Sequence, residues 1–513
     1  MVTAILQNGL SALTAAQRAM NTTANNIANV NTPGYHKQTT NLVSQVIGGM
    51  GAGVGVSGVS RAVDRALQAQ QLKTTTALGA ATINKSYTAS LSQLFGKPSS
   101  GSTIGTAISD LQSKMASFAA ATDNVPASTV IASAQNLATQ LNTLSTSIQD
   151  QRLQADKDVA GDLGQANTLM KQIADYNKDI GSGTATGLNV SDLQDKRDEA
   201  LRQLSVLVGT SSYVRSDGQM VVMTTDGQTL VDGSSANQFG MIGPAPSNTL
   251  MDYTEVTTMT ATTPTNRIGL GTIGSQSKTG DLTNQLIANG GSVGAELNQR
   301  GQYSATASLP QGELQKATAE LNQLALALYN TVQATNLNTT NTAGSSVYDP
   351  TNAVDESNHF FSGVYPNPPA TPGSIDNAAT IQIHPDILAD STLLNTTSGG
   401  TDISISKNLS AALSSTSVSF AAAGNLPAQT GSLSSYASAI LNDVATRADT
   451  ASDAESYQSS LLSTIETRLG DTTGVNLDEE LATLIQQQKA YQAASKVIQT
   501  ADEMLDTLLN LKR

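Results

Sequence analysis

The sequence predicts a mainly α-helical protein with β insertions, in which long terminal helices pair as a coiled-coil-like assembly domain beside a helical body and a small inserted β domain. Two observations carry this prediction. Apolar residues recur alternately four and three residues apart at both ends, over 3–28 and 477–511, as in helices that pack against other helices. Near residue 211 the pattern changes to alternation, with Asp-Gly pairs between short β-rich runs, which is typical of hairpins.

The N-terminal helix has an apolar stripe that Gln17 interrupts. Its members are Leu6, Leu10, Leu13, Met20, Ala24 and Ile27. Glycine, asparagine and threonine are frequent in this helix, and because they form helices less readily than alanine, we expect it to fray in isolation. Pro33 and Gly34 then end it.

The C-terminal helix repeats the spacing and has clear start signals. Its stripe consists of Leu477, Leu481, Leu484, Tyr491, Ile498, Leu505 and Leu509. Asn476 and Glu479 have the spacing of a capping box at its first turn. At about 1.5 Å per residue the two end helices would be roughly 39 and 52 Å long, too long for a compact domain to cover. Two interpretations stay open: the helices pair with each other within one domain, or they also pack between subunits.

The chain between the end helices predicts further elements in order. Strand-like pieces fill 36–59, helices follow at 61–94, 103–122, 128–157, 158–180 and 191–208, and helices return at 281–300, 311–336 and 431–469. The turns of the β-rich part are Asp217-Gly218, Asp226-Gly227 and Asp232-Gly233. We therefore divide the chain into a terminal assembly domain (1–45 and 475–513), a helical body (46–210, 279–336 and 429–474), an inserted β domain (211–278) and a loop-rich mixed region (337–428).

Composition narrows the possible partners. The 27 cationic and 41 anionic side chains give a net charge of −14, which repels phosphate backbones, so we expect no nucleic-acid partner. We also expect no membrane partner and no cleaved signal peptide, because no run of about 18 apolar residues occurs and the first cation is Arg18. Cysteine is absent, which excludes disulfides and thiolate chemistry.

No catalytic, cofactor or metal site stands out in the sequence. Gly53, Gly55 and Gly58 match a dinucleotide-binding glycine pattern, but the acidic residue that such a site needs about 20 positions later is missing. The histidines are far apart among loop-like residues, so we expect surface or turn positions for them. They are His36, His359 and His384. The acidic residues of 192–199 alternate with cations at helical spacing, which predicts a solvated helix face rather than a cation site.

Both ends carry the motifs of a known family. Residues 11–38 resemble the N-terminal motif shared by bacterial flagellar rod, hook and hook-associated proteins, whose centre is ANNIAN followed by NTPGY; here the segment reads SALTAAQRAMNTTANNIANVNTPGYHKQ. Residues 51–67 are also similar to that family, and the similarity gives their glycines a role in close backbone packing. Residues 474–511 resemble the C-terminal segment of the same family, and residues 192–205 and 321–336 are similar to its hook-associated members.

The resemblance implies a structural adaptor of the bacterial flagellum, not an enzyme, that polymerises between hook and filament at the hook–filament junction. Implied partners are further copies of the chain in a helical homo-oligomer, the flagellar hook protein, the second hook–filament junction protein and a flagellar export chaperone at the C-terminal helix. The implied location is extracellular, after type III export without a cleaved signal peptide. Two alternatives stay open: another axial protein, such as the second junction protein or a hook protein, and a flagellum-displayed enzyme or adhesin with its site in the β insert or in 337–428.

The assembly interface that the resemblance implies has an apolar and a polar set of residues. The apolar set is Leu6, Leu10, Leu13, Met20, Ile27, Leu481, Leu484, Tyr491, Ile498, Leu505 and Leu509. The polar set is Asn25, Asn26, Asn29 and Thr32, which would make contacts between neighbouring end segments, with Tyr35 as the anchor of the turn. Poor helix formers and unpartnered stripes predict that both ends are mobile in the free protein.

Overall fold

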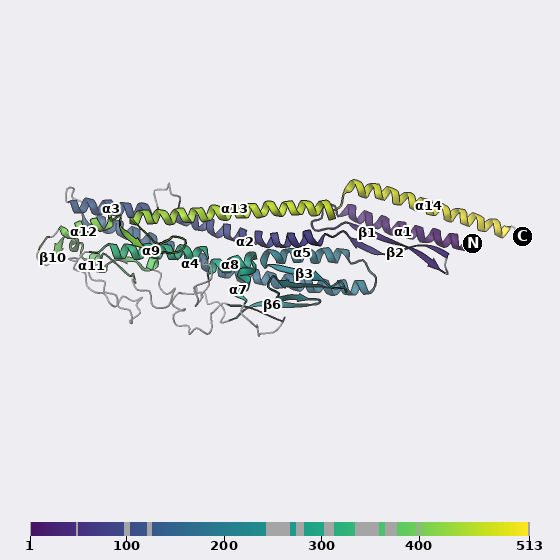
Figure 1. Cartoon of the computed structure of the whole chain (residues 1–513), viewed down its shortest axis with the longest axis horizontal. Helices are drawn as coiled ribbons and strands as arrows, with labels where there is room; N and C mark the ends of the chain where they lie inside the picture. The colour runs from purple at the N-terminus through teal and green to yellow at the C-terminus, as the bar shows by residue number, and fades with distance from the viewer. Residues whose placement is uncertain are drawn as a thin grey trace.

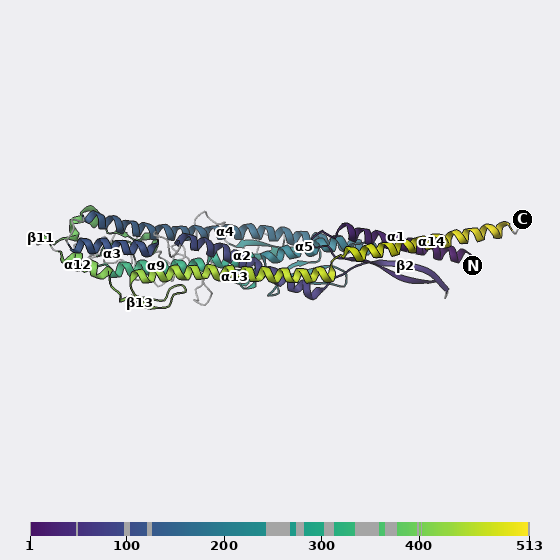
Figure 2. The same cartoon turned by 90° about the horizontal axis from the view of Figure 1, so that it is seen from above.

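The computed structural model describes residues 2–47, 50–96, 103–120, 126–242, 267–272, 282–301, 312–333, 359–364, 377–397, 400–401 and 403–510. Its long helices run side by side in an extended rod (Figure 1). Both chain termini lie at the same end of that rod (Figure 2). Among the described helices, none combines the length and the apolar character that crossing a membrane requires.

The end of the rod that carries both termini consists of two helices and a β-hairpin, which we call the terminal rod. The helices are α1 (Val2–Ala28) and α14 (Leu477–Asn510), and the hairpin strands are β1 (Gln38–Ile47) and β2 (Met50–Arg61). The two helices lie side by side (Figure 1, Figure 2) and run in opposite directions, since Gly9 faces Ile498 and Asn26 faces Glu480. The spacing of apolar residues therefore located both end helices correctly.

Three long helices form the body of the rod. α2 (Arg65–Phe95) and α13 (Leu433–Thr473) run together along it (Figure 1), and α4 (Ala127–Ala185) is one helix of 59 residues. The two separate helices expected at 128–157 and 158–180 are wrong, because that segment has no proline and its buried face continues from Ala155 to Val159. α3 (Ile104–Ala120) and α5 (Ser191–Leu207) pack against α4 and confirm their predicted ranges.

The β-rich part forms an antiparallel sheet whose strand order follows the chain. Its strands are β3 (Thr210–Val214), β4 (Met220–Thr224), β5 (Thr229–Asp232), β6 (Ser235–Ile242) and β7 (Arg267–Thr272). Gly218, Gly227 and Gly233 have positive φ angles of 83°, 90° and 57°, which confirms the three Asp-Gly turns. The part of the insert between β6 and β7 lies outside the described residues.

The sheet shares a hydrophobic core with helices. Buried residues of β4 to β7 belong to one cluster with α5 and the second half of α4, which we call the proximal core; Val222, Phe239, Leu204 and Met170 are among its members. The division into four domains stays a prediction. Within the described residues, however, the sheet has no core of its own, because its buried side chains pack on α4.

The rest of the described chain forms shorter elements. α7 (Thr283–Asn289) and α8 (Gly291–Arg300) replace one predicted helix, because Gly290 and Gly291 have positive φ angles of 77° and 82°. α9 (Glu313–Thr331) confirms the helix expected there. The others are β8 (Phe361–Ser362), α10 (Asn377–Thr380), β9 (Gln382–Ile383), α11 (Pro385–Ala389), η1 (Ser391–Leu394), β10 (Thr396–Thr397), β11 (Gly400–Thr401), α12 (Ser404–Leu413), β12 (Val418–Phe420) and β13 (Gln429–Gly431).

A second cluster of buried residues, the distal core, fills the end of the rod far from the termini. It joins α3, α9, the first half of α4 and the start of α13 with buried side chains of the short elements, such as Phe360, Ile405 and Phe420. The described parts of the region expected to be loop-rich therefore supply core residues.

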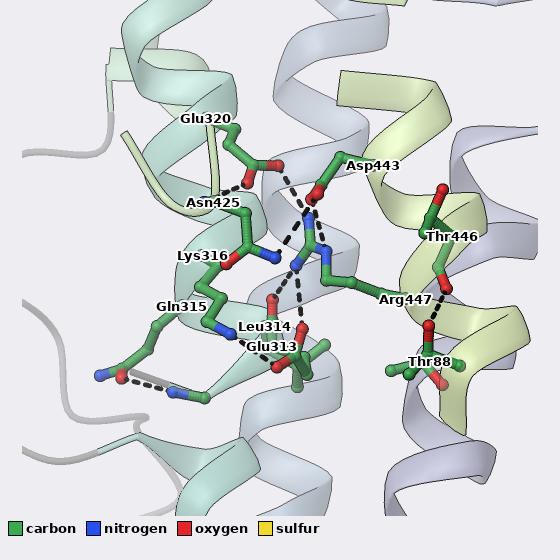
Figure 3. A network of polar contacts seen from close by, with 12 residues as sticks. Thr88, Glu313, Leu314, Gln315, Lys316, Glu320, Asn425, Asp443, Thr446 and Arg447 are labelled. Carbon is green, nitrogen blue, oxygen red and sulfur yellow. Dashed lines mark hydrogen bonds and ion pairs between the residues drawn. The ribbon is translucent and has the colours of Figure 1, made fainter. Parts of the chain in front are cut away.

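A charged network beside the distal core ties α13 to α9 (Figure 3). Arg447 of α13 is buried, its Nη2 lies 2.8 Å from Glu320 Oε2, and its Nε lies 2.6 Å from Asp443 Oδ2. Its Nη1 donates to the backbone oxygen of Glu313 at 3.0 Å. The backbone N–H of Asn425 donates to Glu320 Oε1 at 3.0 Å, so the same carboxylate also fixes the loop before β13. Burial raises the pKa of Glu320 to about 7, although Arg447 opposes this shift.

Candidate assembly interface

α1 and α14 can approach closely because the buried face of α1 carries small side chains. A Cβ atom on Gly9 would lie 2.8 Å from Ile498 Cγ1. Ala15, Ala19 and Thr23 are 3%, 9% and 4% exposed. The distance between packed helices depends on the side chains at the contact, and small residues make it short.

The predicted apolar stripe of α1 lies on a different face. Leu10 is 60% exposed and Ala24 is also exposed. The half-buried members are Leu6, Leu13, Met20 and Ile27. The expectation that this stripe pairs with α14 of the same chain is therefore wrong, because the buried residues Ala19 and Thr23 are offset from it by one position, about 100° around the helix. The stripe is left for contacts outside the chain.

The predicted stripe of α14 is partly correct. Its half-buried members are Leu484, Tyr491, Ile498 and Leu505. The second line of the contact consists of Ala494 and Ala501, which are 8% and 0% exposed, whereas Leu477 and Leu481 are 44% and 42% exposed. Leu509 falls within α14, but its side chain lies outside the described residues.

Large apolar side chains remain on the surface of the terminal rod. Of the fifteen large apolar side chains that are exposed in the described part of the chain, nine belong to α1, β1 and α14. They are Leu10, Leu42, Val43, Val46, Leu477, Leu481, Ile485, Val497 and Met504. Such a concentration marks a surface that another protein covers, so the terminal rod is the candidate assembly interface.

One buried asparagine joins three parts of the terminal rod. Asn26 is 1% exposed, and its Nδ2 donates to Glu480 Oε2 and to the backbone oxygen of Gln38, each at 2.9 Å. Its Oδ1 accepts from the Gln38 backbone N–H at 3.0 Å and from the Tyr35 hydroxyl at 2.9 Å. All four hydrogen-bonding positions of the amide are used. The second asparagine of ANNIAN thus fixes α1, the start of β1 and α14 to one another.

The other predicted polar residues bond within the turn that follows α1. Asn29 Nδ2 donates to the Asn25 backbone oxygen at 3.0 Å, and the Thr32 hydroxyl donates to Asn29 Oδ1 at 3.2 Å. Burial, together with nearby carboxylates of α5 and α14, raises the pKa of Tyr35 to about 12. These contacts lie inside the chain, and a role of the same residues between subunits stays a prediction.

The residue after NTPGY enters a charged cluster that the sequence reasoning missed. His36 Nδ1 lies 2.7 Å from Asp195 Oδ1, and Arg61, at the end of β2, pairs with both Asp195 and Asp198. Asp195 is 8% exposed, so His36 is not a surface histidine and 192–199 is not a solvated face. The spacing of three between Asp192, Asp195 and Asp198 places them on one helix face, and this signal could have indicated the cluster.

Lys37 connects the terminal rod to α13. Its Nζ lies 3.1 Å from Glu480 Oε1 and 3.3 Å from Glu479 Oε2, and its backbone N–H donates to the Thr473 backbone oxygen at 2.9 Å. Burial would lower the pKa of Lys37, but the hydrogen bonds to Glu480 and Glu479 outweigh burial and raise it. We call the contacts of residues 35–38 and Arg61 with α5, α13 and α14 the joint, because they hold the terminal rod against the body.

The remaining sequence candidates have structural roles. A Cβ atom on Gly53 would collide with Ser11 Oγ, which confirms close packing as the role of that glycine. His384 is fully buried and caps α11, and His359 stacks on Tyr329 with ring centroids 4.3 Å apart, so neither is a simple surface residue. Among the residues that the structure describes, no group of three or more histidine, aspartate or glutamate side chains could hold a metal ion.

A rod-shaped subunit whose paired end helices keep apolar side chains exposed belongs to the class of self-assembling structural proteins, and comparison with known proteins identifies the family. The model described as Flagellar hook-associated protein FlgK helical domain matches residues 88–348, about half of the chain. The models described as Flagella basal body rod protein and Flagellar basal body rod FlgEFG protein C-terminal match residues 6–36 and 471–511. The chain belongs to the FlgK family of flagellar hook-associated proteins, a family of structural proteins.

Individual relatives have similar names. Flagellar hook-associated protein 1 from Escherichia coli (strain K12) is 28% identical over 283 residues, which are 53% of this chain and 51% of that protein, so the match spans about half the length of this relative. Flagellar hook-associated protein 1 from Bacillus subtilis (strain 168) is 23% identical over 98% of this chain and 97% of its own length. The solved structure of the flagellar hook junction protein FlgK from Burkholderia pseudomallei is 23% identical, covers 57% of this chain and 46% of its own, and superimposes with a TM-score of 0.42.

Proposed function

We propose that this chain is a structural adaptor that polymerises between the hook and the filament of the bacterial flagellum, at the hook–filament junction. Membership of the hook-associated family supports the location. The observation that carries the proposal is the set of nine large apolar side chains that the terminal rod leaves exposed. An adaptor that assembles through its ends needs such a surface, and an enzyme does not.

The exposed apolar surface is large enough to drive assembly. Each of the nine side chains is 41% to 64% exposed. Burying a whole aliphatic side chain contributes about 1.5–3 kcal/mol, so covering the exposed half of nine contributes roughly 10 kcal/mol per subunit before the entropy cost of association. That cost is of similar size for a single contact, and subunits that contact several neighbours therefore gain most.

The partners follow from the same surfaces. Neighbouring copies of the chain cover the α1 stripe, the hook protein lies on one side of the assembly, and the second junction protein lies on the other. A flagellar export chaperone binds α14 before assembly, when Ile485, Val497 and Met504 are exposed. The chain acts outside the cell, after export through the flagellar type III apparatus.

Electron microscopy of hooks tests the proposal directly. The purified chain is added to hooks isolated from a strain that lacks hook-associated proteins, and capped hooks are counted. The parent chain should cap the hooks, and Leu10→Asp should reduce capping by roughly ten-fold or more, because it places a carboxylate in an apolar seam. Tyr457→Asp is the matched control, since Tyr457 is 64% exposed on α13, outside the terminal rod.

Two results would count against the proposal. Hooks that stay bare in the presence of folded parent chain would show that the chain is not a hook partner. Leu10→Asp that caps as well as the parent would show that the α1 stripe is not the assembly surface.

A further inference from the structure

The proximal core and the distal core are separate, and long helices pass from one to the other. On α4 the distal core ends at Ala155 and the proximal core begins at Val159. On α2 the corresponding residues are Tyr87 and Leu72. We call the region around this change the waist, and it comprises residues 74–84 of α2, 149–164 of α4 and 448–464 of α13.

Two of the helices that cross the waist bury little large apolar surface there. α13, all of whose residues are described, has no buried residue between Arg447 and Ile465, a stretch of roughly 27 Å at about 1.5 Å per residue. α2 buries the threonines of 74–76 there, with Gly79 and Ala81. Small and polar side chains make fewer dispersion contacts than large apolar ones, so the waist is held less tightly than either core.

Polar contacts replace apolar packing at the waist. Arg300 Nη1, from α8, lies 2.9 Å from Asp156 Oδ1 on α4. Between α2 and α13, Lys85 Nζ lies 2.9 Å from Glu455 Oε2, with both side chains partly exposed. Partly exposed polar contacts tolerate small movements, because long side chains reorient and water can replace a lost partner.

Two glycines of α4 lie at the waist without a packing role. Gly161 and Gly164 are exposed, and no neighbouring segment lies within 4 Å of the position that a Cβ atom would occupy. Gly9 differs, because its Cβ atom would meet Ile498. Glycine in a helix interior lowers the local helix equilibrium by about five-fold relative to alanine. α4 is therefore weakest at the place where the packing around it is also weakest.

We propose that the rod bends at the waist, so that the half containing the distal core moves relative to the half containing the proximal core and the terminal rod. Gly161 and Gly164 let α4 bend, while α2 and α13 slide along a contact without large interlocking side chains. Helix bends have local causes such as glycines, and sliding of packed helices is an established form of domain motion. The inference does not depend on the proposed function, and in a junction subunit the bend would accommodate neighbours of different geometry.

Pulsed electron paramagnetic resonance on the full-length chain tests the bend, because the chain has no cysteine and spin labels can be placed at chosen exposed sites. One label pair crosses the waist, with Asn442→Cys on α13 and Thr168→Cys on α4. The reference pair, Asn442→Cys with Thr143→Cys on α4, stays within the distal half. The crossing pair should give a distance distribution roughly two-fold broader than the reference pair.

Alanine at the two glycines should remove the bend. Gly161→Ala with Gly164→Ala should narrow the crossing distribution to the width of the reference pair, and should slow hydrogen exchange of the α4 amides at the waist by roughly ten-fold. Gly470→Ala is the matched control, since Gly470 of α13 also has no neighbour within 4 Å, and it should change neither result. A crossing distribution as narrow as the reference in the parent chain overturns the proposal. So does a distribution that stays broad in the double alanine variant.

Discussion

Glu296, on α8, is a carboxyl group that folding holds in its neutral form. It is 3% exposed, and its Oε2 has no hydrogen-bond partner. Burial and then the carboxylates of Asp162 and Asp158 raise the pKa of Glu296 from 4.5 to about 9. Glu296→Gln keeps the shape of the side chain and removes its ionisation, so this variant isolates the effect of the buried charge.

The expected magnitude follows from the shift. A carboxyl group whose pKa is raised on folding stabilises the protein fully below the unfolded pKa of 4.5, and this contribution is lost as the pH rises toward 9. One pKa unit corresponds to about 1.4 kcal/mol, so the parent loses roughly 3 kcal/mol of unfolding free energy between about pH 5 and 7.5 through this group. The variant does not lose it. Glu296→Gln should match the parent near pH 5 and exceed its stability by roughly 3 kcal/mol near pH 7.5.

Urea unfolding followed by circular dichroism at several pH values measures this difference. Glu503→Gln on α14 is the control, because Glu503 is exposed, and it should follow the parent at every pH. A stability difference between Glu296→Gln and the parent that does not change with pH would refute the reasoning. A variant less stable than the parent near pH 7.5 would do so as well.

Three other variants test the interface, the joint and the charged network. Leu10→Asp should leave the unfolding free energy of the monomer within about 0.5 kcal/mol of the parent, whereas Ile498→Asp should lower both stability and hook capping; equal destabilisation by the two would contradict the assignment of faces. Asp195→Asn should speed limited proteolysis of the terminal rod while the body stays resistant, and an unchanged digestion pattern would show that the joint does not hold the rod. Arg447→Met should cost about 3–5 kcal/mol in thermal melts because it leaves buried carboxylates without a cation, and Glu320→Gln should cost less; the reverse order would be inconsistent with the network.

The positions of the elements could be predicted because local signals determine them. The spacing of apolar residues located α1 and α14, and the Asp-Gly pairs located the turns of the sheet, where each glycine has a positive φ angle. The prediction failed where a local signal was overridden by continuous burial. α4 stays one helix across Gly161 because buried residues follow on both sides of it.

The candidate site was only partly predictable, because its contacts join residues far apart in the chain. Asn26 and Tyr35 were singled out from the motif, but their partner Glu480 was not, since it lies 454 positions from Asn26. His36 and Asp195 are 159 positions apart, and nothing in either segment alone identifies the other as its partner. Spacing of three places acidic residues on one helix face but does not say whether that face meets water or protein.

The sequence by itself determined that the two ends are helices, that each has an apolar stripe, and that the ends belong to a family of flagellar axial proteins. Only the tertiary structure decided which faces of those helices meet. α1 turns its small residues to α14 and leaves Leu10 outside, because closeness of the two backbones, as at Gly9, governs this contact. Periodicity records which residues share a face, whereas the shape of the partner decides which face is buried, and that shape is a property of the folded chain.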